Sequence, residues 1–261
     1  MDYFESSVRI SGGEFPYIRF GTGKKNLVMV AGMSMAGLAG LGGPVSDMYR
    51  DYTEEYTVYV FDRLSVLPDD ASVRSMAQDT AEAMRALSIG KADVMGASQG
   101  GMIELYLAID HPELVHSLIL CSACCYQNEV GKETFSLWSD LADRCDGNGI
   151  YRDFFPRVYT NPSDAALEQC LNTSTAEQCR RFGILARACY EFDCRDELDK
   201  VQCPVLVLGA AQDRVLGGES SPDLAERLGC ESYIYQDFGH AVCDEAPDFQ
   251  KRMLEFLHQI P

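Results

Sequence analysis

The 261-residue sequence has no run of lysine or arginine residues and no apolar stretch long enough to cross a bilayer. Its opening residues, Met-Asp-Tyr-Phe-Glu-Ser-Ser, lack the basic and apolar regions of a secretory signal. The formal net charge is −18, so nucleic acid and anionic membranes would be repelled. We therefore expect a cytoplasmic protein that does not bind nucleic acid, does not insert into membranes, and acts on a small molecule.

Signatures of the common cofactors are also missing. The glycine-rich segment from Gly32 to Pro44 lacks the G-x-G-x-x-G spacing of a dinucleotide-binding loop, and no acidic residue closes a second strand at the required distance. There is no internal repeat, low-complexity tract or flexible linker. The length suits one large α/β domain or two small ones, and leaves open whether the protein is a monomer or a homodimer.

Cysteine is abundant, with eleven residues, but only Cys121-x-x-Cys124, with Cys125 beside it, has the spacing of metal ligands. No second C-x-x-C pair or histidine-rich partner follows. These cysteines end an apolar run, which favours small buried residues at a strand terminus over a metal site. Without a secretory signal, we expect free thiols in a reducing compartment and no metal.

What the sequence does contain is an alternation of short apolar runs and helical patterns. Such an alternation indicates a doubly wound, mostly parallel sheet with helices on both faces. The expected strands are 2–10 and 15–20, paired as a hairpin, followed by 26–31, 56–61, 92–95, 115–120, 205–208 and 231–235. The expected helices are 73–87, with Ser72 as N-cap, then 102–109, 223–228 and 247–260.

The segment 126–200 breaks this alternation, because it contains helical stretches and no comparable strand. It also holds most of the aromatic residues that look exposed: Tyr126, Phe135, Trp138, Tyr151, Phe154, Phe155 and Tyr159. A long insertion between sheet strands is usually functional, so we interpret it as a helical lid on a core formed by 1–125 and 201–261. The alternative that these aromatic residues form only the insertion's own small core stays open.

The stretch Gly96-Ala97-Ser98-Gln99-Gly100-Gly101 lies between an apolar run and a helical pattern, and predicts a strand, a sharp turn and a helix. A serine at the tip of such a turn is strained and is tolerated only if its neighbours lack colliding side chains. Gly96 and Gly100 satisfy that condition. The arrangement presents the Ser98 hydroxyl as a nucleophile and leaves the Gln99 backbone N–H free as a donor.

Three further segments fall at the carboxyl ends of predicted strands, where doubly wound sheets place their sites. They are the glycine-rich loop after 26–31, the Asp213 segment and the Gly239-His240 pair. Of the four histidines, only His240 lies in a loop at that edge, since His111 ends a helix, His116 begins a strand and His258 lies in the terminal helix. As the acidic partner we favour Asp213, and Asp237 and Asp62 remain competitors.

With these pieces, the sequence resembles the α/β-hydrolase family over nearly its whole length. The matching motifs are the turn at Ser98, the loop Gly209-Ala210-Ala211-Gln212-Asp213, and Phe238-Gly239-His240, in the family's chain order of serine, acid and histidine. The resemblance implies that Ser98 attacks a carbonyl carbon, that His240 takes and returns the proton, and that Asp213 orients His240. It also implies an oxyanion hole from the backbone N–H groups of Met33 and Gln99.

The predicted activity is hydrolysis of a small, partly hydrophobic carboxylic ester through an acyl-enzyme on Ser98, without a cofactor. A carbon–carbon bond hydrolase, a lactonase and a thioesterase of the same fold remain alternatives. A ligand-binding member of the fold without activity is an alternative from another class. The arginines of 126–200 would allow an acidic substrate if one or two pointed inward.

Overall fold

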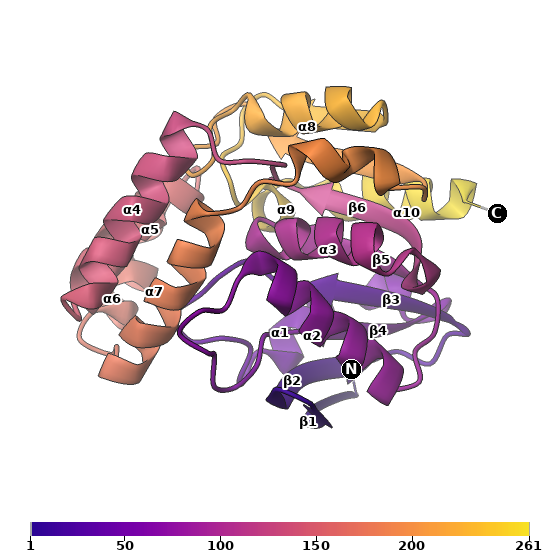
Figure 1. The fold of residues 1–261 in the computed structure, drawn as a ribbon, viewed down its shortest axis with the longest axis horizontal. Coiled ribbons are helices and arrows are strands. Elements are labelled where there is room, and N and C mark those ends of the chain that lie inside the picture. Colours follow the sequence, from indigo (N-terminus) through magenta and orange to yellow (C-terminus); the bar gives the residue numbers. More distant parts are fainter. Residues whose placement is uncertain (1, 261) are drawn as a thin grey trace.

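A computed structural model describes residues 2–260, which fold around an eight-stranded sheet (Figure 1). The strand order is β1-β2-β4-β3-β5-β6-β7-β8; the pairs β1–β2 and β2–β4 are antiparallel, and the pairs from β4 through β8 are parallel. The strands are β1 (Tyr3–Ile10), β2 (Gly13–Phe20), β3 (Lys25–Val30), β4 (Tyr56–Phe61), β5 (Ala92–Ala97), β6 (Val115–Cys121), β7 (Val205–Ala210) and β8 (Glu231–Tyr235). The predicted mostly parallel sheet is confirmed.

The two faces of the sheet bury separate sets of side chains, because successive residues of a strand point to opposite faces. On β3, Val28 and Val30 pack on one side with helices α2 (Val73–Ala86), α3 (Gln99–Asp110) and α8 (Ser220–Leu228). Leu27 and Met29 pack on the other side, against α9 (Val242–Glu245) and α10 (Phe249–Gln259). Both faces are therefore covered, as the apolar strands require.

Local sequence explains where several helices begin. Ser72 caps α2 through a capping box with Ser75, as predicted. The residues Gly42 to Met48 form a short helix, α1, although the glycine-rich sequence predicts a loop as far as Pro44. Proline is well tolerated in the first turn of a helix, where its missing N–H has no partner to lose. Short 3₁₀ helices occupy Arg50–Tyr52, Pro112–Leu114 and Arg195–Lys200.

Four helices lie between β6 and β7, and they gather at one side of the molecule, at left in Figure 1. They are α4 (Glu129–Asp143), α5 (Gly147–Val158), α6 (Asp164–Cys170) and α7 (Ala176–Tyr190). Trp138 lies at their centre, with ring centroids of Phe135, Phe154 and Phe182 within 5.2 to 5.7 Å. The aromatic residues that look exposed in the sequence are buried or half-buried. All of them except Tyr126 pack on one another, and Tyr126 lies under Arg195 and Arg227 instead.

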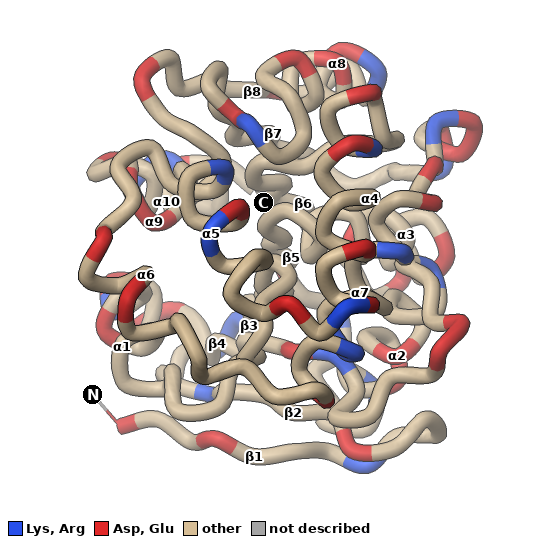
Figure 2. Tube along the Cα trace, turned by 90° about the vertical axis from the view of Figure 1, so that its left-hand side faces the viewer, with Lys and Arg blue, Asp and Glu red and all other residues tan. Residues whose placement is uncertain are grey.

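The cysteines at the end of β6 and just after it are core residues. Cys121, Cys124 and Cys125 are almost completely buried, and burial raises the pKa of the Cys125 thiol to about 11. None of the helices in residues 2–260 has the length and apolar character needed to cross a membrane. Acidic residues are spread around the whole trace instead of lying on one side (Figure 2).

Candidate active site

Ser98 occupies a strained turn between the end of β5 and the start of α3. Its φ is 55° and its ψ is −121°, a backbone conformation that residues other than glycine rarely adopt. A Cβ on Gly96 would come within 2.5 Å of the Gly100 backbone, and a Cβ on Gly100 would collide with the carbonyl of Val30. The two glycines are thus required for the turn. The Ser98 N–H donates to the Cys121 carbonyl at 2.8 Å, which fixes the turn to β6.

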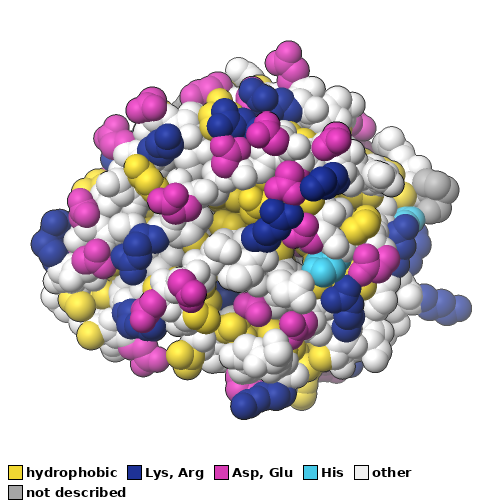
Figure 3. Space-filling model, in the orientation of Figure 1, with side chains coloured by type: hydrophobic (Ala, Val, Ile, Leu, Met, Phe, Trp, Pro, Cys, Tyr) yellow, Lys and Arg dark blue, Asp and Glu magenta, His cyan; other side chains and the backbone are white. Residues whose placement is uncertain are grey.

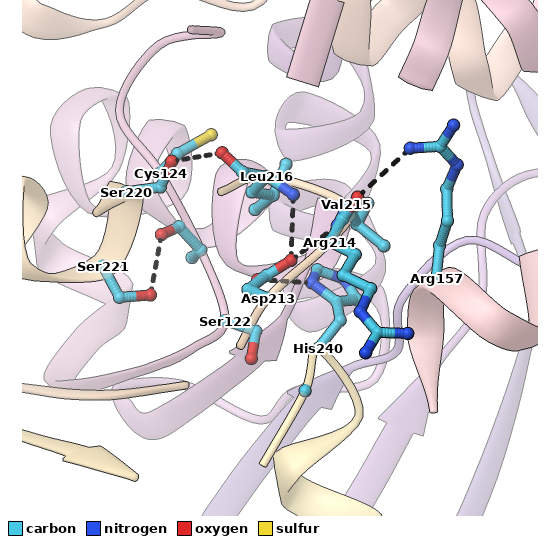
Figure 4. Close-up of polar contacts among 12 residues, drawn as sticks. Ser122, Cys124, Arg157, Asp213, Arg214, Val215, Leu216, Ser220, Ser221 and His240 are labelled. Atoms are coloured by element: carbon cyan, nitrogen blue, oxygen red, sulfur yellow. Dashed lines mark hydrogen bonds and ion pairs between the residues drawn. The ribbon is translucent and has the colours of Figure 1, made fainter. Parts of the chain in front are cut away.

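His240 and Asp213 form a buried pair at the same sheet edge. His240 Nδ1 lies 2.7 Å from Asp213 Oδ2, and Asp213 Oδ1 accepts hydrogen bonds from the N–H groups of Val215 at 2.8 Å and Leu216 at 2.9 Å (Figure 4). A carboxylate oxygen accepts hydrogen bonds, so we assign the proton of this bond to His240 Nδ1, which donates to Asp213 Oδ2. His240 Nε2 is then left to act as a base.

The competing acids lie elsewhere. Asp62 accepts hydrogen bonds from Arg181 at 2.7 Å and from the Leu38 N–H at 3.2 Å, and Asp237 is exposed. Neither contacts His240 in the described part of the chain.

The remaining histidines have partners away from Ser98. His111 contacts Gln78 and Arg85, His116 contacts Asp93, and His258 contacts Glu55.

A cavity of about 330 Å³ opens beside this pair. Ser98 and His240 line it together with Met33, and the helical insertion contributes Trp138 and Phe154 to its wall. Within residues 2–260 no hydrogen bond joins the Ser98 hydroxyl to His240. Catalytic hydrogen bonds are often long before a substrate binds, so this does not remove Ser98 from the candidate set.

The loop after β3 passes close to the Ser98 side chain. A Cβ on Gly32 would lie 3.5 Å from Ser98 Cβ, and Met33 is buried in the cavity wall. The loop is held in place, since Ser34 Oγ accepts from the Gly37 N–H at 2.9 Å. In residues 2–260 the backbone N–H groups of Met33 and Gln99 have no hydrogen-bond acceptor. Two free donors next to a nucleophile are what an oxyanion hole requires.

Arg63 supports this loop. The sequence alone did not predict a role for it. Its Nη1 donates to the Gly32 carbonyl at 3.3 Å, and burial lowers the pKa of Arg63 to about 10. The Nε and Nη2 atoms have no partner among the described residues. The available signal was an arginine placed two residues after the end of the fully buried strand β4.

The sequence also did not indicate the contacts that join the His240 loop and α9 to the end of α5 and to Thr160 just after it. The Gly239 N–H donates to Thr160 Oγ1 at 2.7 Å, and the Ala241 N–H donates to the Val158 carbonyl at 2.8 Å. Glu245 accepts from the N–H of Thr160 at 3.0 Å and from its hydroxyl at 2.6 Å. These bonds attach the insertion directly to the loop that carries His240.

The strand order, the serine turn after β5 and the pair at the ends of β7 and β8 define a hydrolase of the α/β fold. The family model for the α/β-hydrolase fold matches residues 37–154, and the chain has this fold.

Among curated proteins, the chain is 26% identical over 236 residues to one from Rhizobium rhizogenes named "Putative carbamate hydrolase RutD", covering 85% of this chain and 90% of that one. An enol-lactonase of Burkholderia xenovorans has a TM-score of 0.81 at 18% identity, covering 97% of this chain and 100% of that one. An esterase of Exiguobacterium antarcticum has a TM-score of 0.81 at 19% identity, covering 98% and 100%. At such identities the two structures show a shared fold alone.

Proposed function

We propose that this protein is a serine hydrolase that cleaves small, partly hydrophobic carboxylic esters through an acyl-enzyme on Ser98. The observation that carries the proposal is the position of Ser98, strained and half-buried, in the wall of a largely apolar cavity that His240 also lines. A buried Asp213 holds the far side of the His240 ring. This combination gives a nucleophile, a base and an orienting acid.

The reaction proceeds in two halves. Ser98 Oγ attacks the ester carbonyl carbon while His240 Nε2 takes its proton, and the negative oxygen binds the N–H groups of Met33 and Gln99. Collapse of this intermediate releases the alcohol, which receives the proton from His240. Water then attacks the acyl-enzyme while His240 takes its proton. Collapse of this second intermediate releases the acid as His240 returns the proton to Ser98 Oγ. Each backbone donor contributes about 2.7 to 4 kcal/mol to stabilising the intermediate.

A carbamate presents the same kind of carbonyl carbon to Ser98, so the name of the Rhizobium rhizogenes relative is compatible with these steps. The large apolar share of the cavity wall favours an ester with an apolar group. Carbamate esters should nevertheless be tested as substrates beside carboxylic esters. If they were turned over faster, the preferred substrate would be a carbamate and the mechanism would stay the same.

Helices α4–α7 act in this proposal as a lid. Trp138, Phe154 and Tyr159 support it, because these side chains of the insertion line the cavity. We also place the protein in the reducing cytoplasm. All eleven cysteines are free thiols, and free thiols are typical of proteins in a reducing compartment.

The test is covalent labelling of the folded protein with a fluorophosphonate probe, combined with turnover of p-nitrophenyl esters. We expect the wild type to be labelled and S98A to lose labelling, with turnover reduced by about 10⁴-fold or more. The matched control is S122A, because Ser122 also follows a strand at this edge with a positive φ of 43° but is buried. Labelling of S98A, or an unlabelled wild type with normal circular dichroism, would contradict the proposal.

A further inference from the structure

The cavity beside Ser98 carries charge of one sign only. No lysine or arginine lines it within the described residues, and Asp244 is its one acidic lining residue. An ionised group bound there would therefore meet a carboxylate and no cationic side chain.

The arginines of the helical insertion do not alter this balance. Arg157, Arg180, Arg181 and Arg187 form ion pairs with Asp153, Asp69, Asp62 and Asp143 respectively. Arg144 and Arg152 are exposed and, like the other four, are absent from the cavity wall. The possibility of an acidic substrate held by these arginines therefore finds no support in the cavity.

Asp244 lies on α9, four residues after His240; it is exposed and is one of the residues that line the cavity. Burial by the surrounding protein raises the pKa of Asp244, and the nearby Glu245 adds to the shift, while the hydrogen bond from Cys243 Sγ to Oδ1 at 3.6 Å opposes it. The Asp244 side chain therefore lines the cavity and is partly desolvated by the protein around it.

Part of the cavity wall is aromatic. Phe154 and Tyr159, both half-buried, line it, and aromatic faces attract cations through their quadrupole. An alkylammonium group would thus find both a carboxylate and π-faces, and an uncharged apolar group would find the apolar wall. A carboxylate or sulfonate would find repulsion at Asp244 and no compensating donor from a charged residue.

We infer that Asp244 is a specificity-determining residue, which makes this cavity take esters with an uncharged or ammonium-bearing end and reject esters with an anionic end. The inference rests on the proposed function, because it concerns the substrate of Ser98. The inference restricts the proposed substrates, which are small and partly hydrophobic esters, to those without an anionic end. It also assigns a role to Asp244, which is not one of the three candidate catalytic side chains.

The experiment uses p-nitrophenyl esters of three acids of equal chain length that end in a tert-butyl, a trimethylammonium or a sulfonate group. Their charges do not change with pH near neutrality. For the wild type we expect kcat/KM for the sulfonate ester to be at least about tenfold below that for either other ester. Asp244→Asn should reduce this difference at least threefold, by about 0.65 kcal/mol or more, mainly through KM for the sulfonate ester.

The matched control is Asp237→Asn, which removes the same charge three residues before His240 from a side chain that does not line the cavity. It should leave the ratio unchanged. Equal kcat/KM for the tert-butyl and sulfonate esters, or the same ratio in Asp244→Asn as in the wild type, would overturn the inference while leaving the esterase proposal intact.

A binding measurement keeps the inference testable even if no ester is hydrolysed. Trp138 is the sole tryptophan of the sequence and lines the cavity, so its fluorescence reports binding of the three corresponding N-phenyl amides to S98A. The sulfonate amide should bind at least about tenfold more weakly than the ammonium amide, a difference that Asp244→Asn reduces. Equal binding of the two amides would overturn the charge selectivity, and absent turnover with selective binding would overturn only the proposed chemistry.

Discussion

Asp79 is a carboxylate that folding places in an unfavourable setting. It lies on α2, half-buried under the turn between β1 and β2, where a Cβ on Gly12 would lie 3.5 Å from its Oδ1. Burial raises the pKa of Asp79 to about 6, and the nearby Glu82 adds to the shift. Ionising Asp79 therefore costs folding free energy, in contrast to Glu82, whose carboxylate accepts two hydrogen bonds from Ser11.

Asp79→Asn should accordingly stabilise the protein, and the gain should depend on pH. The folded state holds its proton more tightly than the unfolded state, so the wild type loses stability as the pH rises from about 4 to about 6. Above about pH 6 we expect Asp79→Asn to gain about 1 to 3 kcal/mol, and the gain to shrink as the pH falls towards 5. Thermal unfolding of the wild type and of Asp79→Asn at about pH 8, 6 and 5 measures this gain in stability.

The control for Asp79→Asn is Asp70→Asn, which removes the same charge from an exposed side chain just before α2. It should change stability by less than about 0.5 kcal/mol at each pH. A gain from Asp79→Asn that is equal at pH 8 and pH 5 would show that charge burial is not its cause.

At the scale of elements, helix α7 is attached to the loop after β4 by two neighbouring arginines in different environments. Arg181 donates to Asp62 Oδ1 at 2.7 Å and to the Leu64 carbonyl at 2.6 Å, and both side chains of the pair are largely buried. Arg180 pairs with Asp69, whose side chain is 84% exposed. The two pairs make the same connection between elements, so burial is the main variable that separates them.

Arg181→Met should destabilise the protein by about 2 to 4 kcal/mol, since it leaves a mostly buried carboxylate without its charged partner. Arg180→Met should cost about 0 to 1 kcal/mol, because exposed ion pairs contribute little. Urea unfolding of both variants measures the difference. Equal losses in the two variants would mean that packing of the arginine stems, and not the buried charge, holds α7 to the core.

The elements themselves were largely predictable from sequence. The strands β4 and β8 have the predicted bounds, because continuous or alternating apolar residues end at clear polar or glycine boundaries. Ser98, Asp213 and His240 could be placed on one edge because each follows a strand, and parallel strands bring their carboxyl ends together. Local pattern was sufficient wherever position in the chain determines position in the sheet.

The supporting residues were not predictable in this way. The bond from Arg63 to Gly32 and the bond from Gly239 to Thr160 join segments far apart in the sequence. Likewise, Asp244 is one acidic residue among many in the sequence, and only the structure shows that it lines the same cavity as Ser98. No periodicity encodes such contacts, because they depend on how the helical insertion packs on the sheet.

At the scale of the whole molecule, the net charge of −18 adds a long-range field to the local effect of Asp244. On the face seen in Figure 3, lysine and arginine stand singly or in small groups among acidic side chains, and no continuous basic patch interrupts the field. Such a field concentrates cations and depletes anions near the surface. Dissolved salt screens it over a Debye length of about 10 Å at 0.1 M ionic strength, whereas a contact inside the cavity is screened much less.

Ionic strength should therefore separate the two contributions to specificity. Between about 0.01 M and 0.3 M salt, we expect kcat/KM of the wild type to rise about two- to fivefold for the sulfonate ester, to fall similarly for the trimethylammonium ester, and to stay constant for the tert-butyl ester. Asp244→Asn should show the same salt dependence from a smaller starting difference, because the surface charge is nearly unchanged. If salt completely abolished the preference of the wild type against the sulfonate ester, that preference would arise from the net surface charge and not from Asp244.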